Sequence, residues 1–418
     1  MTRVAGLSRY RYLGCVPTPP PADVLALHDS TPDEVESRAE LDHHIHKGTL
    51  AGLTVQGLRL DEDPVPDLTD IDLTETLFVG CRFASPEVES AAVRRGAHVI
   101  PGFPALPYPT HPSHLYTADE LAAGFADGGF AGMYDTVVYE HFRAHGGALP
   151  EVREALAQRL HDHAIDNALY DAVRGWLVHH GPESVVGVMG GHAVPRGSAP
   201  YRLAATLGWE LTRADQLVVT GGGPGVMEAA NLGAYFAGRS TADLALAIDL
   251  LAAAPDFLDH DPYTAAALAV RERFAPAVSD GPNAWAHSGG LAIPTWLYGH
   301  EPANLFAGRV AKYFSNAIRE DMILRLARGG IVFAAGRAGT VQEVFQAATK
   351  TFYGTDGASG AYVFLDRAFW TETLPIEKLL RPLMALSPFG DLSSTIHVTD
   401  DVAEAVRVLT ATASDPAT

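Results

Sequence analysis

The chain of 418 residues has little cysteine, little lysine and no long apolar run. Its two cysteines, Cys15 and Cys81, are too few for a disulfide framework or for a zinc site of their own, which suits a reducing compartment. No stretch approaches the roughly 20 apolar residues of a membrane span, and the first residues lack the apolar core and cleavage site of a signal peptide. We therefore expect a soluble, cytoplasmic protein.

Basic residues are also scarce. The chain has 30 lysines and arginines against 50 aspartates and glutamates, which gives a formal net charge of −20. A field of this sign repels nucleic acid and anionic membranes, so we expect neither as a partner. Any anionic ligand must then be held by local donors.

Several catalytic and metal-binding signatures are absent from the sequence. We find no G-x-x-x-x-G-K-[ST], no G-x-S-x-G and no H-E-x-x-H. Histidines gather at 43–46, 141–145 and 161–163 with spacings that resemble ligand pairs, but no cysteine stands near them. We interpret them as solvated or core histidines and expect neither a metal nor an organic cofactor.

The pattern of the sequence changes near residue 180. Residues 1–130 mix proline-rich loops, a leucine-rich segment and a short strand-helix-strand pattern, which predicts an α+β extension that suggests no function. Residues 131–180 are strongly helical and form the predicted connector. Residues 181–418 alternate buried strands with helices, which predicts an α/β domain with a Rossmann-like, doubly wound parallel sheet.

Three loops follow predicted strands of this last region, at residues 189–199, 221–225 and 335–339. The carboxyl ends of parallel strands meet at one edge of a sheet, so the loops face one crevice. Their glycines let the backbone approach a ligand, and each following helix directs free N–H groups at an anion. One such loop is as readily a tight turn, but three in register favour a phosphate-bearing ligand, a mononucleotide rather than NAD or ATP with magnesium.

Two of these loops carry a recognisable pair of motifs. GGGPGVMEAANLGA at 221–234 and GRAGTVQE at 336–343 resemble the signatures GGGxxGxM and PGGxGTxxE of the "lonely guy" family of phosphoribohydrolases. The stretch 299–321, which contains E-P-x-N, is similar to the longer bacterial branch, the nucleotide 5′-monophosphate nucleosidases. The resemblance covers residues 183–411. It implies hydrolysis of purine or pyrimidine nucleoside 5′-monophosphates to free base and ribose 5-phosphate.

An older label of the same family, "lysine decarboxylase", does not fit this sequence. That chemistry needs a lysine that forms a Schiff base with pyridoxal phosphate. The only His-Lys pair, His46-Lys47, lies outside the nucleotide-binding half.

The resemblance implies two catalytic residues. The acid of the second signature falls on Glu343, and the arginine of the preceding helix falls best on Arg319, with Arg325 and Arg328 as competitors. A carboxylate below the sugar ring stabilises the oxocarbenium-like charge of glycosidic cleavage. Taken alone, Thr340-x-x-Glu343 is also the pattern of a helix capping box.

The same loops are expected to bind the substrate. Ala335 and Arg337 replace a proline and a glycine of the family signature, and they favour the alternative of a nucleotide-binding sensor without turnover. Trp296, Tyr298 and His300 can stack on the base or form a packed loop. The predicted substrate-binding residues are Gly190, Gly191, Gly221, Gly222, Gly223, Gly225, Met227, Glu228, Gly336, Arg337, Ala338, Gly339 and Thr340.

The stretch 303–328 is expected to be one long helix. Its apolar residues are more numerous than one sheet-facing stripe requires, so part of it is expected to pack on another subunit or on the N-terminal half. The family resemblance implies a homodimer, and a second interface would give a homotetramer. The apolar residues are Leu305, Phe306, Val310, Tyr313, Phe314, Ile318, Met322 and Leu326.

Overall fold

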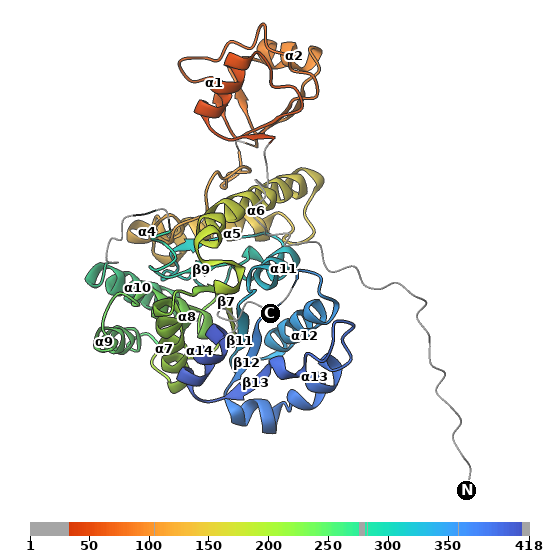
Figure 1. Ribbon diagram of the computed structural model, residues 1–418. Coiled ribbons are helices and arrows are strands. Elements are labelled where there is room, and N and C mark those ends of the chain that lie inside the picture. Colours follow the sequence, from red (N-terminus) through yellow and green to blue (C-terminus); the bar gives the residue numbers. More distant parts are fainter. Residues whose placement is uncertain (1–32, 104, 276–280, 282, 358, 412–418) are drawn as a thin grey trace.

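The computed structural model describes residues 33–103, 105–275, 281, 283–357 and 359–411. Cys15 lies outside these residues, and Cys81 is buried. The described residues form a seven-stranded sheet, a four-stranded sheet and a two-stranded ribbon (Figure 1). None of the helices in the described part of the chain is both long and apolar enough to cross a bilayer.

The seven-stranded sheet is parallel throughout, with the order β10-β9-β8-β7-β11-β12-β13. The chain starts in the middle at β7, moves outward through β8 to β10, and then returns to β11 on the other side of β7. This reversal confirms the predicted Rossmann-like, doubly wound α/β fold. The strands are β7 (Val185–Met189), β8 (Leu217–Thr220), β9 (Leu291–Ala292), β10 (Arg309–Val310), β11 (Gly330–Phe333), β12 (Ala361–Leu365) and β13 (Ile396–Thr399).

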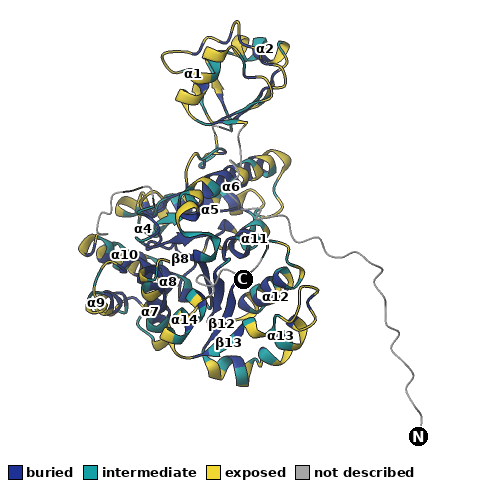
Figure 2. Cartoon of the chain, in the orientation of Figure 1, coloured by how far each residue is buried: buried dark blue, intermediate teal, exposed yellow. Residues whose placement is uncertain are grey.

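Helices cover both faces of this sheet. Every residue of β7, β8, β11 and β12 is buried, as expected for apolar runs such as VVGVM and AYVFL between two helical layers (Figure 2). In Figure 1, α7, α8 and α14 lie on one face and α11, α12 and α13 on the other. These helices are α7 (Ala199–Arg213), α8 (Val226–Tyr235), α11 (Asn316–Leu326), α12 (Ala338–Tyr353), α13 (Glu377–Met384) and α14 (Val402–Ala411); α9 (Thr241–Leu251) and α10 (His260–Arg273) belong to the insertion after α8.

The N-terminal unit has a parallel sheet and an apolar core of its own, around Leu41, Val55 and Phe78. The predicted strand-helix-strand pattern is confirmed, because β4 and β6 pair in parallel around α2. The predicted domain boundaries at 130 and 180 stay a prediction. The elements are β1 (Glu34–Val35), α1 (Arg38–Lys47), β2 (Thr54–Gln56), β3 (Arg59–Leu60), β4 (Leu77–Val79), β5 (Arg82–Phe83), α2 (Pro86–Arg94) and β6 (His98–Ile100).

The helical segment lies between this unit and the large sheet (Figure 1). Its longest element is α6 (Val152–His180), preceded by α3 (Ala118–Ala122), α4 (Phe125–Gly132) and α5 (Tyr134–Ala144). Asp162 of α6 accepts hydrogen bonds from the backbone N–H groups of Phe314 (2.7 Å) and Ser315 (2.9 Å). Ser315 is the N-cap of α11, so the buried face of α6 helps to fix where α11 begins.

The predicted long helix over 303–328 is wrong. Only α11 is helical, and the preceding residues form a loop and the short edge strand β10. The apolar residues of this stretch are used within the chain and are not left over for a subunit interface. Seven of the eight are buried, and Ile318 packs against the core. The predicted homodimer or homotetramer itself stays a prediction.

Candidate functional site

A cavity of about 620 Å³ lies where the loops after β7, β8 and β11 converge. This is the point at which the chain reverses its direction across the sheet, the expected place for a ligand in such folds. The segment after β9 forms another wall. Gly225, Glu228 and Ala338 do not line the cavity; the predicted residues that do are Gly190, Gly191, Gly221, Gly222, Gly223, Met227, Arg319, Gly336, Arg337, Gly339, Thr340 and Glu343.

Glu228 corrects the prediction most clearly. Its side chain is buried, and it accepts hydrogen bonds from Arg196 Nε (2.9 Å) and from the hydroxyls of Tyr201 (2.9 Å) and Tyr263 (2.7 Å). The guanidinium of Arg196 also lies 3.2 Å from the centre of the Tyr263 ring. Because these partners already occupy the carboxylate, Glu228 ties α8 to α7 and α10, and its side chain does not line the cavity.

The ends of two long side chains lie close to the backbone of the loop after β8. A Cβ at Gly221 would lie 2.8 Å from Arg319 Nη1, and a Cβ at Gly223 would lie 2.7 Å from Met227 Cε. Gly225 has a positive φ of 70°, and a Cβ there would lie 2.4 Å from a backbone oxygen of the loop after β7. Gly225 therefore serves the packing of two loops against each other.

Buried amide side chains join the loop after β8 to the segment after β9, which forms a wall of the cavity. Asn231 Oδ1 accepts hydrogen bonds from Thr220 Oγ1 (2.6 Å) and from Asn304 Nδ2 (2.9 Å), and Asn231 Nδ2 donates to the Gly289 carbonyl (2.6 Å). The Gly222 N–H donates to Thr220 Oγ1 (3.1 Å). Asn304, the asparagine of the E-P-x-N motif, thus has a structural role, because it helps to fix two walls of the cavity relative to each other.

The amino end of α12 opens into the cavity. The helix begins after Arg337, and the described residues provide no side-chain cap for it. Thr340 lies inside the first turn, so the capping-box alternative for Glu343 is wrong, because it needs Thr340 at the N-cap. A Cβ at Gly336 would lie 2.2 Å from Thr340 Oγ1, so a larger residue would not fit at position 336.

The two predicted catalytic side chains meet in this cavity. Arg319 of α11 is 7% exposed, and its Nη2 lies 3.9 Å from Glu343 Oε1 and 3.4 Å from Glu320 Oε1. Arg325 instead donates to the Tyr170 hydroxyl (3.3 Å), and neither it nor Arg328 lines the cavity. Of the three arginines considered, Arg319 alone lines the cavity.

Burial raises the pKa of Glu343 from its ordinary value of 4.5 to about 7. The positive charge of Arg319 acts against this increase, and the negative charge of Glu320 adds to it. The side chain of Glu343 is only 14% exposed, so solvent compensates little. A carboxyl of this pKa exchanges protons at neutral pH, as a general acid or base must.

The neighbouring groups leave one donor of Arg319 without a partner. Glu320 accepts hydrogen bonds from Asn316 Nδ2 (2.8 Å) and Gln342 Nε2 (2.9 Å), which hold its carboxylate beside the guanidinium. Arg319 Nε is buried and has no hydrogen-bond partner among the described residues. Buried donors of this kind are rare in folded proteins, and a ligand oxygen would satisfy it.

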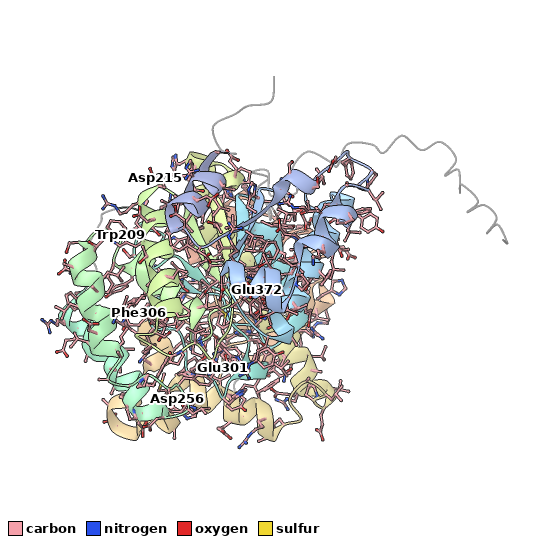
Figure 3. All side chains as sticks on the ribbon, turned by 90° about the horizontal axis from the view of Figure 1, so that it is seen from below. Trp209, Asp215, Asp256, Glu301, Phe306 and Glu372 are labelled. Carbon is pink, nitrogen blue, oxygen red and sulfur yellow. The ribbon has the colours of Figure 1, made fainter. Side chains whose placement is uncertain are left out.

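A second, half-buried carboxyl that was not predicted from the sequence, Glu301, also lines the cavity. Burial raises the pKa of Glu301, and the nearby charge of His192, whose Nδ1 is 2.9 Å from Glu301 Oε1, lowers it in part. Lys312 also lines the cavity and forms an ion pair of 2.7 Å with Asp135. Glu301, labelled in Figure 3, is the first residue of the E-P-x-N motif, which is the signal that could have identified it.

The aromatic residues near this motif divide into two groups. Trp296 is fully buried, donates from Nε1 to Asp135 Oδ1 (2.8 Å) and packs on Phe314, so it belongs to the core. Tyr298 and His300 line the cavity. For these two, stacking on a base stays a prediction.

Comparison with protein families gives a partial match. A model of the SLOG cluster4 family matches residues 183–244, which run from just before β7 to the first turn of α9. SLOG proteins are related to nucleotide-processing proteins of the "lonely guy" type, so this segment supports a nucleotide-related function. The match covers less than half of the chain. No curated protein matches the chain.

Proposed function

We propose that the chain hydrolyses the N-glycosidic bond of nucleoside 5′-monophosphates, which releases the free base and ribose 5-phosphate. The observation that carries this proposal is the buried carboxyl of Glu343, with a pKa of about 7 and 3.9 Å from the Arg319 guanidinium, in a cavity bounded by glycine loops. The partial match to the SLOG cluster4 family supports a nucleotide as the ligand.

The 5′-phosphate would bind at the amino end of α12. The first N–H groups of that helix and its dipole favour an anion, and Gly339 and Thr340 of its first turn line the cavity. Arg337 also lines the cavity and is exposed, so its guanidinium can reach a phosphate. These local donors would offset the repulsion from a chain whose net charge is −20.

Glu343 would act on the sugar. As the bond from C1′ to the base breaks, the base takes the electron pair and the ribose gains oxocarbenium-like positive charge. Ionised Glu343 stabilises that charge and accepts a proton from the water whose oxygen adds to C1′. A proton delivered to the departing base completes the reaction. A phosphate fixed at the start of α12 holds the ribose at a set distance from Glu343, one turn further along the same helix.

Arg319 would help to keep Glu343 functional. Its charge opposes the effect of burial on the pKa of Glu343, which increases the ionised fraction at neutral pH. Its unpartnered Nε can also donate to an oxygen of the ribose or the phosphate. Replacement by lysine would keep the charge and lose the fixed planar array of donors.

The test is a panel of purine and pyrimidine monophosphates assayed for released base and for ribose 5-phosphate. Wild-type protein should cleave at least one of them, and Glu343→Gln should bind that nucleotide with nearly unchanged affinity while turnover falls by about 100-fold or more, the scale of a lost acid-base group. Glu210→Gln, an exposed change on α7, is the matched control and should behave as wild type.

Two results would overturn the proposal. Wild-type turnover in Glu343→Gln would remove Glu343 from the chemistry. Tight binding of monophosphates by wild-type protein, without release of base from any of them, would favour the nucleotide-binding sensor. Ala335 and Arg337, which depart from the family signature in the loop before α12, are the residues that favour that alternative.

A further inference from the structure

Three possible metal ligands converge at the end of the large sheet opposite to the cavity. His180 ends α6, Asp215 lies in the turn before β8, and His287 lies shortly before β9. One ligand atom from each residue lies within 4.8 Å of the others. The three residues come from segments far apart in the sequence and are brought together only by the fold.

The imidazole of His180 is held in a defined orientation. It stacks on the indole of Trp176 with the ring centres 3.8 Å apart and an angle of 9° between the planes. Its Nδ1 lies 3.1 Å from the Trp176 carbonyl oxygen, so Nδ1–H can donate there and leave the lone pair of Nε2 for a ligand. Metal-binding histidines commonly have such a partner for the second ring nitrogen.

The other two side chains are available to a ligand. Asp215 has a positive φ of 54°, and its side chain has no hydrogen-bond or ion-pair partner in the described part of the chain. His287 contacts the Trp176 ring at 5.1 Å between ring centres, and its ring nitrogens have no partner among the described residues. Both histidines are half-buried, whereas Asp215 is exposed, so water can complete a coordination sphere.

We propose that His180, Asp215 and His287 form a binding site for a divalent transition metal of the zinc type. Two imidazole nitrogens and one carboxylate oxygen suit zinc and its first-row neighbours, whereas calcium and magnesium prefer oxygen ligands alone. Water would occupy the remaining positions.

The location of the site gives it a structural role. Asp215 and His287 precede β8 and β9, and the loops that follow these strands form walls of the cavity. In Figure 3, Asp215 lies far from Glu301 of the cavity. The metal would therefore tie the end of α6 to the segments that lead into two neighbouring strands, and it would stabilise the fold without entering the reaction. This inference is independent of the proposed function.

The test measures zinc binding to the full chain, freed of affinity tags and treated with a chelator. Equilibrium dialysis against zinc should give one bound equivalent per chain, and cobalt should give the visible absorption of a protein-bound ion. Asp215→Asn and His287→Ala should each weaken zinc binding by at least about 10-fold, whereas His179→Ala, at the exposed neighbour of His180, should leave it unchanged.

A second measurement separates binding at this site from binding elsewhere or from misfolding. Metal-free Asp215→Asn should melt as metal-free wild type does. Zinc should then raise the melting temperature of wild type and His179→Ala but not that of Asp215→Asn, because only a ligand of the native state stabilises it. Less than one equivalent bound to wild type, or the same zinc affinity and the same increase in all variants, would overturn the proposal.

Discussion

The buried carboxyl of Glu343 should make the fold less stable at alkaline pH, and Glu343→Gln should remove that effect. A carboxyl with a pKa of about 7 in the folded chain and an ordinary value of 4.5 in the unfolded chain is protonated only in the folded state between these values. The free energy of unfolding must then fall as the pH rises from 4.5 to 7. The neutral glutamine imitates the protonated acid and does not titrate.

The size of the effect follows from the same two pKa values. The interval from 4.5 to about 7 corresponds to about 3 kcal/mol, because one pKa unit is worth about 1.4 kcal/mol. The side chain is 14% exposed, so little of this is lost to solvent screening. Relative to wild type, Glu343→Gln should therefore gain about 3 kcal/mol more at pH 8 than at pH 4.

Urea unfolding at pH 4, 6 and 8 measures this difference. Burial also raises the pKa of Glu36 to about 7, so the wild-type curve contains more than one contribution in the same pH range. Subtracting the variant from wild type isolates Glu343. The exposed substitution Glu210→Gln should show no gain that depends on pH.

The same difference in unfolding free energy between Glu343→Gln and wild type at pH 4 and at pH 8 would refute this prediction. That result would mean that Glu343 titrates as an exposed carboxyl, and its assignment as the acid-base group would lose its physical basis. A gain that increases as the pH falls would contradict the sign of the argument.

Three further predictions concern the site and the assembly. If Glu343 acts as a carboxylate, as proposed, kcat/KM should fall below about pH 7, and Glu320→Gln should move this fall to lower pH by removing a charge that raises the pKa of Glu343; an unchanged pH profile would contradict the proposed role. AMP should be cleaved and adenosine should not, because only the phosphate can use the start of α12; equal rates would place the ligand elsewhere. Light scattering should show at least a dimer of the 44.5 kDa chain, as the family resemblance implies; a wild-type monomer with full activity would contradict this.

The large sheet could be predicted because short segments of the sequence are enough to indicate its strands. A strand buried on both faces needs an almost continuous apolar run, and VVGVM, LVVT and AYVFL are such runs between helical patterns. Parallel order then places the loops after the strands at one edge. The convergence of three glycine loops therefore needed no knowledge of long-range contacts.

The failed predictions come from tertiary contacts. The apolar residues of 303–315 suggested a helix, but they pack in a loop and an edge strand that core contacts hold in place. Glu228 follows Met227 in the motif, yet successive helix residues point about 100° apart, so one lines the cavity and the other is buried between helices. No spacing rule joins His180, Asp215 and His287, because distant segments supply them.

The two glutamates of the signature motifs, Glu228 in α8 and Glu343 in α12, differ in how the fold satisfies their charge. Glu228 accepts hydrogen bonds from a guanidinium at 2.9 Å and from two tyrosine hydroxyls, so groups of the chain itself satisfy its charge. Glu343 meets its guanidinium only at 3.9 Å, and burial raises its pKa to about 7. A carboxylate held in that way is unstable until positive charge develops beside it. Stabilisation of an oxocarbenium-like ribose in the transition state would release that unfavourable energy, which is why the weakly paired acid is the one we assign to the chemistry.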